Sequence, residues 1–137
     1  MPFSNDLTVR MSRRQEHPYA EFLIHVSRPG RYVGREPGSV LKTVDASGLS
    51  VCLAFPDVYE IGMSYLGFQI LYHQLADDPS IACERAFAPW FDLEEKLRER
   101  SLPLVSMESW RPLSEFDVLG FTMQYELSWT NVLNMMD

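Results

Sequence analysis

Three apolar segments, separated from one another by helical patterns, constrain the fold of this chain more than any other feature of its sequence. Residues 50–55 are almost uniformly apolar, residues 81–86 form a second, weaker segment, and residues 117–123 form a third. A strand that lacks alternation between polar and apolar residues is covered on both faces, as in a parallel sheet. Strands that alternate with helices are joined by right-handed crossovers. The sequence therefore predicts an α/β fold, with a Rossmann-like parallel sheet that carries helices on both faces.

The same apolar pattern predicts the order of the strands. Residues 51–55 are expected to form the central strand, flanked by residues 81–86 on one side and residues 118–123 on the other, all parallel. Apolar residues at three-to-four spacing predict the helices: about two turns from Pro18, one helix over residues 62–75, an exposed charged helix over residues 93–100, and one over residues 127–136. The predicted apolar face of the helix over residues 62–75 carries Met63, Leu66, Gly67, Ile70, Leu71 and Leu75.

The chain divides into two parts on this pattern. Residues 1–48 are expected to form an N-terminal helix and a turn-rich lead-in, and residues 49–137 an α/β domain. A sheet of three strong strands is thin, because sheets usually have about five or more. A helix over residues 127–136 should also lead to another parallel strand. We therefore expect the sheet to be incomplete and the chain to be the N-terminal piece of a longer polypeptide.

Charge is distributed unevenly along the chain, whose formal net charge is −7. Residues 1–49 carry seven basic and five acidic residues, a balance of +2, whereas residues 50–137 carry five basic and fourteen acidic residues, a balance of −9. The acidic domain is therefore not expected to bind nucleic acid by itself. The arginines of the lead-in lie among glycines and prolines, which predicts a solvated loop over the domain surface.

Neither a membrane segment nor a metal site is predicted for this chain. Its apolar stretches are shorter than the roughly 18 to 20 residues of a spanning helix, and its N-terminus does not resemble a signal peptide, so we expect a cytoplasmic protein. Cys52 and Cys83 both lie in predicted strands, where free, buried thiols are expected. No cysteine spacing suits a metal, and no paired acids or nucleophile motif indicates a catalytic residue.

The candidate ligand site lies at the carboxyl edge of the predicted sheet. Asp57 and Gly62 bound a loop that leaves the first strand and opens a helix, where free backbone N–H groups converge. The same two residues also suit a plain strand-to-helix turn, and that interpretation stays open. Thr122 and Gln124 follow the third strand at the same edge. Together with Tyr59, which lies in the first loop, these are the candidate cofactor-binding residues.

Four blocks of sequence, in order along the chain, resemble the N-terminal region of a family of radical S-adenosylmethionine (SAM) proteins. They are residues 31–36, 54–67, 87–90 and 120–128. Members of this family carry a cobalamin-binding-like α/β domain before a radical SAM barrel, so the resemblance implies a 4Fe-4S cluster and SAM for the parent protein. The cluster-binding pattern Cys-x-x-x-Cys-x-x-Cys does not occur in this chain. We therefore expect the catalytic centre beyond residue 137 and no catalytic role for the chain itself.

Residues 57–62 also resemble the cobalamin-binding signature Asp-x-His-x-x-Gly, with Tyr59 in the place of the histidine that ligates cobalt. A phenol with a pKa of about 10 stays protonated and is a poor cobalt ligand. The Ser-x-Leu turn of such sites is only loosely matched by Thr122, Met123 and Gln124, and no Gly-Gly pair occurs. The resemblance thus implies a vestigial cobalamin-binding-like domain, and cobalamin ligated by histidine is not expected.

Two other functions are compatible with the sequence: a non-catalytic interaction module that docks a partner such as an RNA-processing assembly, and an independent small-molecule binder of flavodoxin-like shape. As partners we expect the rest of the parent chain and, for this chain alone, self-association. An incomplete sheet exposes a strand edge and an apolar helix face, which pair with other chains. The residues expected to be buried against a second copy are Met123, Leu127, Val132, Leu133 and Met136.

Overall fold

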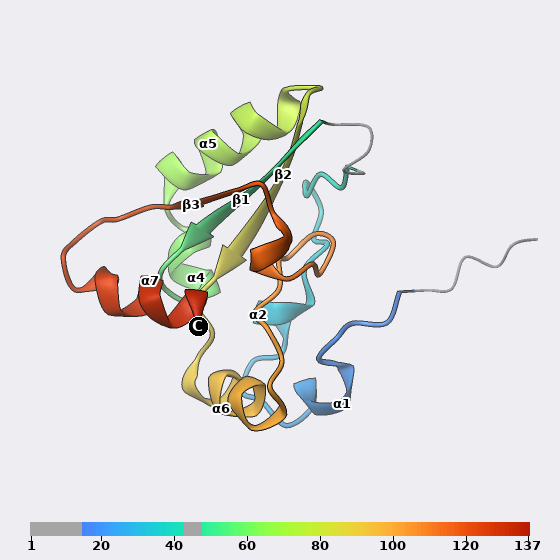
Figure 1. Cartoon of the computed structure of the whole chain (residues 1–137), viewed down its shortest axis with the longest axis vertical. Helices are drawn as coiled ribbons and strands as arrows, with labels where there is room; N and C mark the ends of the chain where they lie inside the picture. Colours follow the sequence, from blue (N-terminus) through green and yellow to red (C-terminus); the bar gives the residue numbers. More distant parts are fainter. Residues whose placement is uncertain (1–14, 43–47) are drawn as a thin grey trace, which may run out of the picture.

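A three-stranded parallel sheet forms the centre of the fold (Figure 1). The computed structural model describes residues 15–42 and 48–137. Strand β1 (Leu49–Phe55) lies between β2 (Ile81–Phe87) and β3 (Val118–Phe121), and both pairings are parallel. The predicted α/β class, strand order and strand direction are therefore confirmed, although β3 is shorter than predicted.

Helices connect and flank the strands. α5 (Leu66–Asp77) joins β1 to β2, α6 (Phe91–Arg100) lies between β2 and β3 in the sequence, and α7 (Ser128–Met136) follows β3. No helix within residues 15–42 and 48–137 is long and apolar enough to cross a membrane. The short elements are α1 (Ala20–Leu23), α2 (Gly30–Val33), α4 (Tyr59–Met63) and the 3-10 helix η1 (Leu113–Glu115).

One face of the sheet is covered by α5. Successive side chains of a strand point to opposite faces, so the odd-numbered residues of β1 share this face. Val51 and Leu53 are buried in one cluster with Phe68 and Tyr72 of α5. Phe55 meets Phe68 edge-on, with ring centroids 5.5 Å apart. Aromatic side chains of α5 therefore anchor the helix to the central strand.

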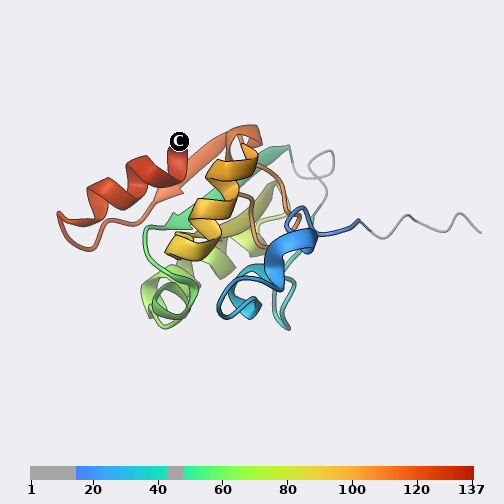
Figure 2. The same cartoon turned by 90° about the horizontal axis from the view of Figure 1, so that it is seen from below.

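The opposite face is covered by α7 and by the segment that leads into β3 (Figure 2). Cys52 and Ala54 of β1 pack with Leu113 of η1 and Met135 of α7. Cys52 and Cys83 are both free and buried, as predicted. Helices thus cover both faces of the sheet, which is the reason that β1 tolerates an almost uniformly apolar sequence.

α6 belongs to neither of these layers. Its buried residues Leu93 and Leu97 cluster with Tyr19 and Phe22, so α6 packs against α1 of the lead-in (Figure 1). The charged outer side of α6 carries an ion pair between Glu94 and Arg98, at 3.1 Å. This cluster joins the lead-in to the α/β part, and the expected division of the chain at residue 49 stays a prediction.

The helix predicted over residues 62–75 is interrupted in the structure, which divides it into α4 and α5. Tyr65, between the two helices, has an extended backbone with φ −89° and ψ 103°. α5 therefore begins in a new rotational phase, and Phe68, Tyr72 and Ala76, spaced by four residues, point inwards. The predicted apolar face is wrong in consequence, because Leu66, Ile70 and Leu71 of that face are exposed.

Candidate functional site

The carboxyl ends of β1 and β3 form the switch point of the sheet. The chain leaves β1 towards α5 on one face and leaves β3 towards α7 on the other, so the two connections diverge (Figure 1). In open α/β sheets, ligands bind in the crevice between two such connections. Asp57 follows β1 and Thr122 follows β3, so these two candidate residues lie on the two sides of the switch point.

The carboxylate of Asp57 is engaged in the turn after β1. Its Oδ1 accepts a hydrogen bond from the backbone N–H of Val58 at 2.7 Å, and its Oδ2 accepts a longer one from the hydroxyl of Tyr125 at 3.4 Å. The backbone carbonyl of Asp57 accepts from the N–H of Ala88 at 2.9 Å. These contacts support the interpretation of Asp57 as a turn residue.

The contacts of Gly62 are with the core. A Cβ atom added to Gly62 would lie 2.4 Å from Cε1 of Phe87 and 3.1 Å from Cγ of Phe55. These rings belong to the buried cluster of the sheet and cannot move aside without disturbing it. The close approach of α4 to the ends of β1 and β2 therefore accounts for a glycine at this position without a ligand.

Tyr59 packs beside Gly62 on the same ring. Its ring meets Phe87 edge-on, with centroids 5.3 Å apart. It also lines a cavity of about 10 Å³ together with Arg31 and Tyr32, which is room for about one water molecule. Burial raises the pKa of Tyr59 above its ordinary value of 10.0, and the nearby carboxylate of Glu36 raises it further. The phenol is therefore protonated at neutral pH.

The loop between β3 and α7 bridges the switch point. The N–H of Thr122 donates to the carbonyl of Ala54 at 3.1 Å, and the Thr122 hydroxyl is buried with no hydrogen-bond partner among residues 15–42 and 48–137. Nδ2 of Asn131 in α7 donates to the carbonyl of Pro56 at 2.8 Å. Gln124 is exposed. With the tyrosine contact to Asp57, the chain's own side chains thus link the ends of β1 and β3.

A larger cavity, of about 440 Å³, lies between α6 and α7 and is lined by residues that include Leu97, Arg98, Asn134 and Met135. None of the five candidate site residues lines it. Within the described part of the chain, no three His, Cys, Asp or Glu side chains are grouped so that they would hold a metal ion. The structure therefore brings Asp57 and Thr122 to one edge, but it does not gather the five candidates around one cavity.

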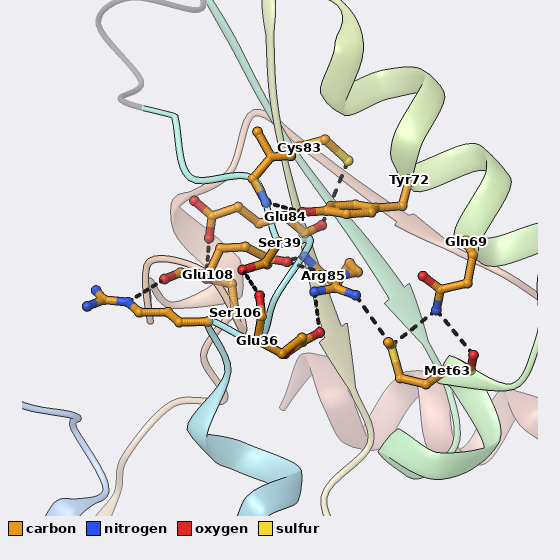
Figure 3. Close-up of polar contacts among 12 residues, drawn as sticks. Glu36, Ser39, Met63, Gln69, Tyr72, Cys83, Glu84, Arg85, Ser106 and Glu108 are labelled. Atoms are coloured by element: carbon orange, nitrogen blue, oxygen red, sulfur yellow. Dashed lines mark hydrogen bonds and ion pairs between the residues drawn. The ribbon is translucent and has the colours of Figure 1, made fainter.

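A second polar cluster, which the sequence analysis missed, lies at the outer edge of β2 (Figure 3). Nε of Arg85 donates to Oε1 of Glu108 at 2.7 Å, and the backbone N–H of Arg85 donates to Oε2 at 2.8 Å. The backbone carbonyl of Arg85 accepts from the N–H of Met107 at 2.8 Å. The Glu108 carboxylate thus takes the place that the carbonyl of a neighbouring strand would have in a sheet.

The guanidinium of Arg85 is paired with two carboxylates inside the protein. The side chains of Arg85 and Glu108 are 3% and 0% exposed, and Nη2 of Arg85 contacts Oε1 of Glu36 at 2.6 Å. The guanidinium lies 4.4 Å from the ring centroid of Tyr72. Burial raises the pKa of Glu108, and the attraction of Arg85 offsets only part of that effect. Each ion therefore depends on its partner for compensation of lost hydration.

Glu84 fastens the same segment from the other face of β2 (Figure 3). Its Oε2 accepts from the hydroxyl of Ser106 at 2.5 Å, from the hydroxyl of Ser109 at 2.7 Å and from the N–H of Ser109 at 3.1 Å. Because Glu84 and Arg85 point to opposite faces, residues 105–109 are held on both sides of the strand.

The lead-in closes the beginning of this edge. Nζ of Lys42 donates to the carbonyls of Ala76 and Ile81 at 2.5 and 3.0 Å, at the end of α5 and the start of β2. Arg31 places its Nε 2.8 Å from both carboxylate oxygens of Glu60. The lead-in lies over the domain surface, with Arg28 and Arg35 exposed, but partners distant in sequence fix the side chains of Arg31 and Lys42.

Arg85, Glu108, Glu36 and Glu84 form what we call the β2 cluster, which covers this edge of the sheet. Their ionisable groups are bound to one another, to backbone groups and to serine hydroxyls. One sequence signal pointed to it. Glu84 and Arg85 interrupt an otherwise apolar strand, and charged residues within a strand are typical of a sheet edge. The identity of the segment that covers the edge depends on contacts more than 20 residues away in sequence, as with Glu108 and Arg85.

Comparison with known protein families identifies a match over the second half of the chain. A family model described as "Radical SAM proteins, N-terminal" matches residues 67–137, which are 71 of the 137 residues. The match begins in α5 and continues through β2, α6 and β3 to α7, whereas the loop with Asp57 and Tyr59 precedes it. No curated protein and no solved structure matches the chain.

Proposed function

The chain belongs to the family of N-terminal regions of radical SAM proteins, and from this premise we propose that it is a vestigial, cobalamin-binding-like domain of a radical SAM enzyme. In this proposal the domain itself is not catalytic. The strand order β2-β1-β3 has its switch point between β1 and β3, as in doubly wound folds that bind cofactors there. The chemistry of the 4Fe-4S cluster and of SAM would belong to the rest of the enzyme.

The position of Tyr59 supports this proposal most strongly. A resident cobalamin of the usual type needs a ligand to cobalt at this position, and the protonated phenol is held against Phe87. A ligand would also compete with the contacts that Tyr125 and Asn131 make to the end of β1. The residues present therefore do not fit a cobalamin ligated by the protein, although they keep the loop pattern of such a site.

The two cysteines do not fit a cluster site either. Cys52 and Cys83 are buried within strands and lie on different faces of the sheet, since they belong to different core clusters. An iron–sulfur cluster is held by several cysteine thiolates that converge on it. We therefore assign the cluster to another part of the enzyme.

Titration with hydroxocobalamin, followed by its visible spectrum, tests the proposal. We expect no spectral change with the wild-type chain or with Tyr59→Phe, because Tyr59 is not a cobalt ligand. Circular dichroism of both proteins provides the control for folding. Tight binding with a spectral shift that Tyr59→Phe abolishes would contradict the proposal.

The alternative function is an interaction module that docks a partner such as an RNA-processing assembly through the basic lead-in and the exposed sheet edge. The contacts of the described lead-in residues support it less well, and Arg10, Arg13 and Arg14 lie outside the described residues. Arg31 is bound to Glu60, and the guanidinium of Arg35 lies 3.6 Å from the ring centroid of Trp110. Arginines that are committed to internal partners are poor contacts for phosphate groups. A filter-binding assay with single-stranded RNA at low salt separates the two functions, and we expect no retention of RNA.

A further inference from the structure

The outer edge of β3 is the open side of the sheet. β3 pairs with β1 on its inner side, and no strand pairs with its outer side within residues 15–42 and 48–137. Val118, at the start of β3, is exposed. An unpaired strand edge offers backbone N–H and carbonyl groups to a further strand.

The connections between strands indicate where the next strand belongs. The connection from β1 to β2 crosses the face covered by α5, and the connection from β2 to β3 crosses the other face through η1. The two connections also move in opposite directions across the sheet, as right-handed crossovers require. α7 lies on the same face as η1. A strand reached through α7 therefore lies beyond β3, on its open side.

α7 itself has a second apolar stripe that its own chain leaves uncovered. Ser128, Val132 and Met135 face the sheet and are buried. Val132 was expected against a second copy of the chain, and this expectation is corrected, because the residue is buried within its own chain. The residues one position further along, Trp129, Leu133 and Met136, repeat the helical spacing and are each at least 60% exposed.

The charges around this surface favour a basic partner. Residues 112–137 contain four acidic residues and neither lysine nor arginine; Asp137 is paired with Arg98 of α6, whereas Glu115 and Glu126 are exposed and have no ion pair within residues 15–42 and 48–137. A second copy would bring like charges together, which opposes association. A segment that carries lysine or arginine beside apolar residues complements the surface in both charge and hydrophobicity.

From these observations we propose that the open edge of β3 and the outer stripe of α7 form one docking surface. Its occupant is the β-strand and helix that follow α7 in the radical SAM polypeptide, with the strand parallel to β3 and basic residues flanking its apolar core. This inference rests on the family membership and on the crossover geometry. It does not depend on the cobalamin proposal.

Hydrogen exchange measured by mass spectrometry tests the docking surface. We compare the 137-residue chain with the longer polypeptide of the same gene, both without cobalamin, so that the result does not depend on Tyr59. The amides of β3 should exchange at least about tenfold more slowly in the longer polypeptide, because a paired edge opens less often. Leu133→Glu should remove this protection, and Ile70→Glu on the exposed side of α5 should leave it unchanged.

Two results would overturn the proposal. The first is equal exchange of β3 in the short and the long polypeptide. The second is protection of β3 in the 137-residue chain that rises with protein concentration, together with a dimer mass by light scattering. That second result would identify another copy of the chain as the occupant, which is the self-association expected from the sequence.

Discussion

The two edges of the sheet are finished in different ways. At the β2 edge, Glu108 and Met107 bind the backbone of Arg85, and an ion pair joins the side chain of Arg85 to Glu36 of the lead-in. At the β3 edge, the described part of the chain provides no such cover, and Val118 is exposed. Both edges belong to one sheet of parallel strands, so the difference comes from the segments placed beside them.

This difference shows that a charged edge and an apolar edge have different requirements. The charged side chains of β2 are buried and need polar partners, which the chain supplies from two distant segments. The apolar edge of β3 needs only another strand and an apolar layer. The requirement of the β2 edge is therefore satisfied within the chain, whereas the β3 edge is suited to association with another segment.

The largest effect on the difference between the two edges is expected from Arg85→Met, which removes the cation at the β2 edge. Removal of the guanidinium leaves Glu108 as a buried carboxylate without its cation, so the free energy of unfolding should fall by about 3–5 kcal/mol. Urea denaturation followed by circular dichroism measures this loss. Arg98→Met, which removes exposed ion pairs with Glu94 and Asp137 and a contact with Asn134, is the control and should have a much smaller effect. An equally small effect of Arg85→Met would show that the β2 cluster does not hold the edge.

Two neighbouring methionines at the end of α7 belong to different stripes of the helix. Met135 is 4% exposed and Met136 is 62% exposed. Met135→Ala should lower the free energy of unfolding by about 2–4 kcal/mol because it leaves a cavity under the helix. Met136→Ala should change it by no more than about 0.5 kcal/mol. Equal losses in thermal or urea unfolding would mean that the outer stripe is already covered in the chain alone.

A smaller effect is expected where the lead-in meets the β2 edge. Lys42→Met removes charge-assisted hydrogen bonds to the carbonyls of Ala76 and Ile81, and the loss should be about 1–2 kcal/mol in urea unfolding. Lys96→Met provides the matched control, since Lys96 lies on the charged outer side of α6 and forms an ion pair with Glu99 there. If both variants unfold at the same urea concentration, the lead-in does not contribute to the closure.

The smallest effect is expected at the contact that ties β3 to β1. Oδ2 of Asp117 accepts from the N–H and the hydroxyl of Ser50 at 2.8 and 2.7 Å, and these bonds lower the pKa of Asp117 below its ordinary value of 3.8. The contact therefore stabilises the fold above that value, and its contribution is lost as the pH falls through the lowered pKa. Asp117→Asn should flatten the acid limb of the unfolding curve measured against pH.

Ser50→Ala provides the control for this pH effect. In a chain that already carries Ser50→Ala, the further change Asp117→Asn should alter the acid limb less than in the wild-type chain, because the bond from the Ser50 hydroxyl is gone and only the bond from the backbone N–H remains. A slope that persists in Asp117→Asn alone would assign the acid sensitivity to other carboxylates.

Local patterns in the sequence were sufficient to predict the sheet. The unbroken apolar run in β1 predicted a strand covered on both faces, and such a strand occupies the centre. The break at Tyr65 was not predicted, because both sides of it have apolar residues at helical spacing. The phase of α5 depends on which aromatic residues reach the sheet, and Phe68 and Tyr72 were outside the predicted face.

The sequence predicted the location of the candidate site better than the contacts of its residues. Asp57 and Thr122 do lie at the carboxyl ends of β1 and β3, as strand polarity requires. The packing of Gly62 on Phe87 is a contact between elements, so the motif alone could not distinguish it from an approach to a ligand. The partners of Arg85 could not be predicted from the sequence for the same reason, since Glu36 and Glu108 come from separate segments.

The bond from Glu108 to the backbone of Arg85 also limits how copies of this domain can assemble. Open-ended growth of sheets, as in fibres, requires two free edges on every subunit. Here the side chain of Glu108 blocks one of them. Two copies joined through β3 would therefore exhaust the free edges at once, and polymerisation along the sheet would stop at a pair.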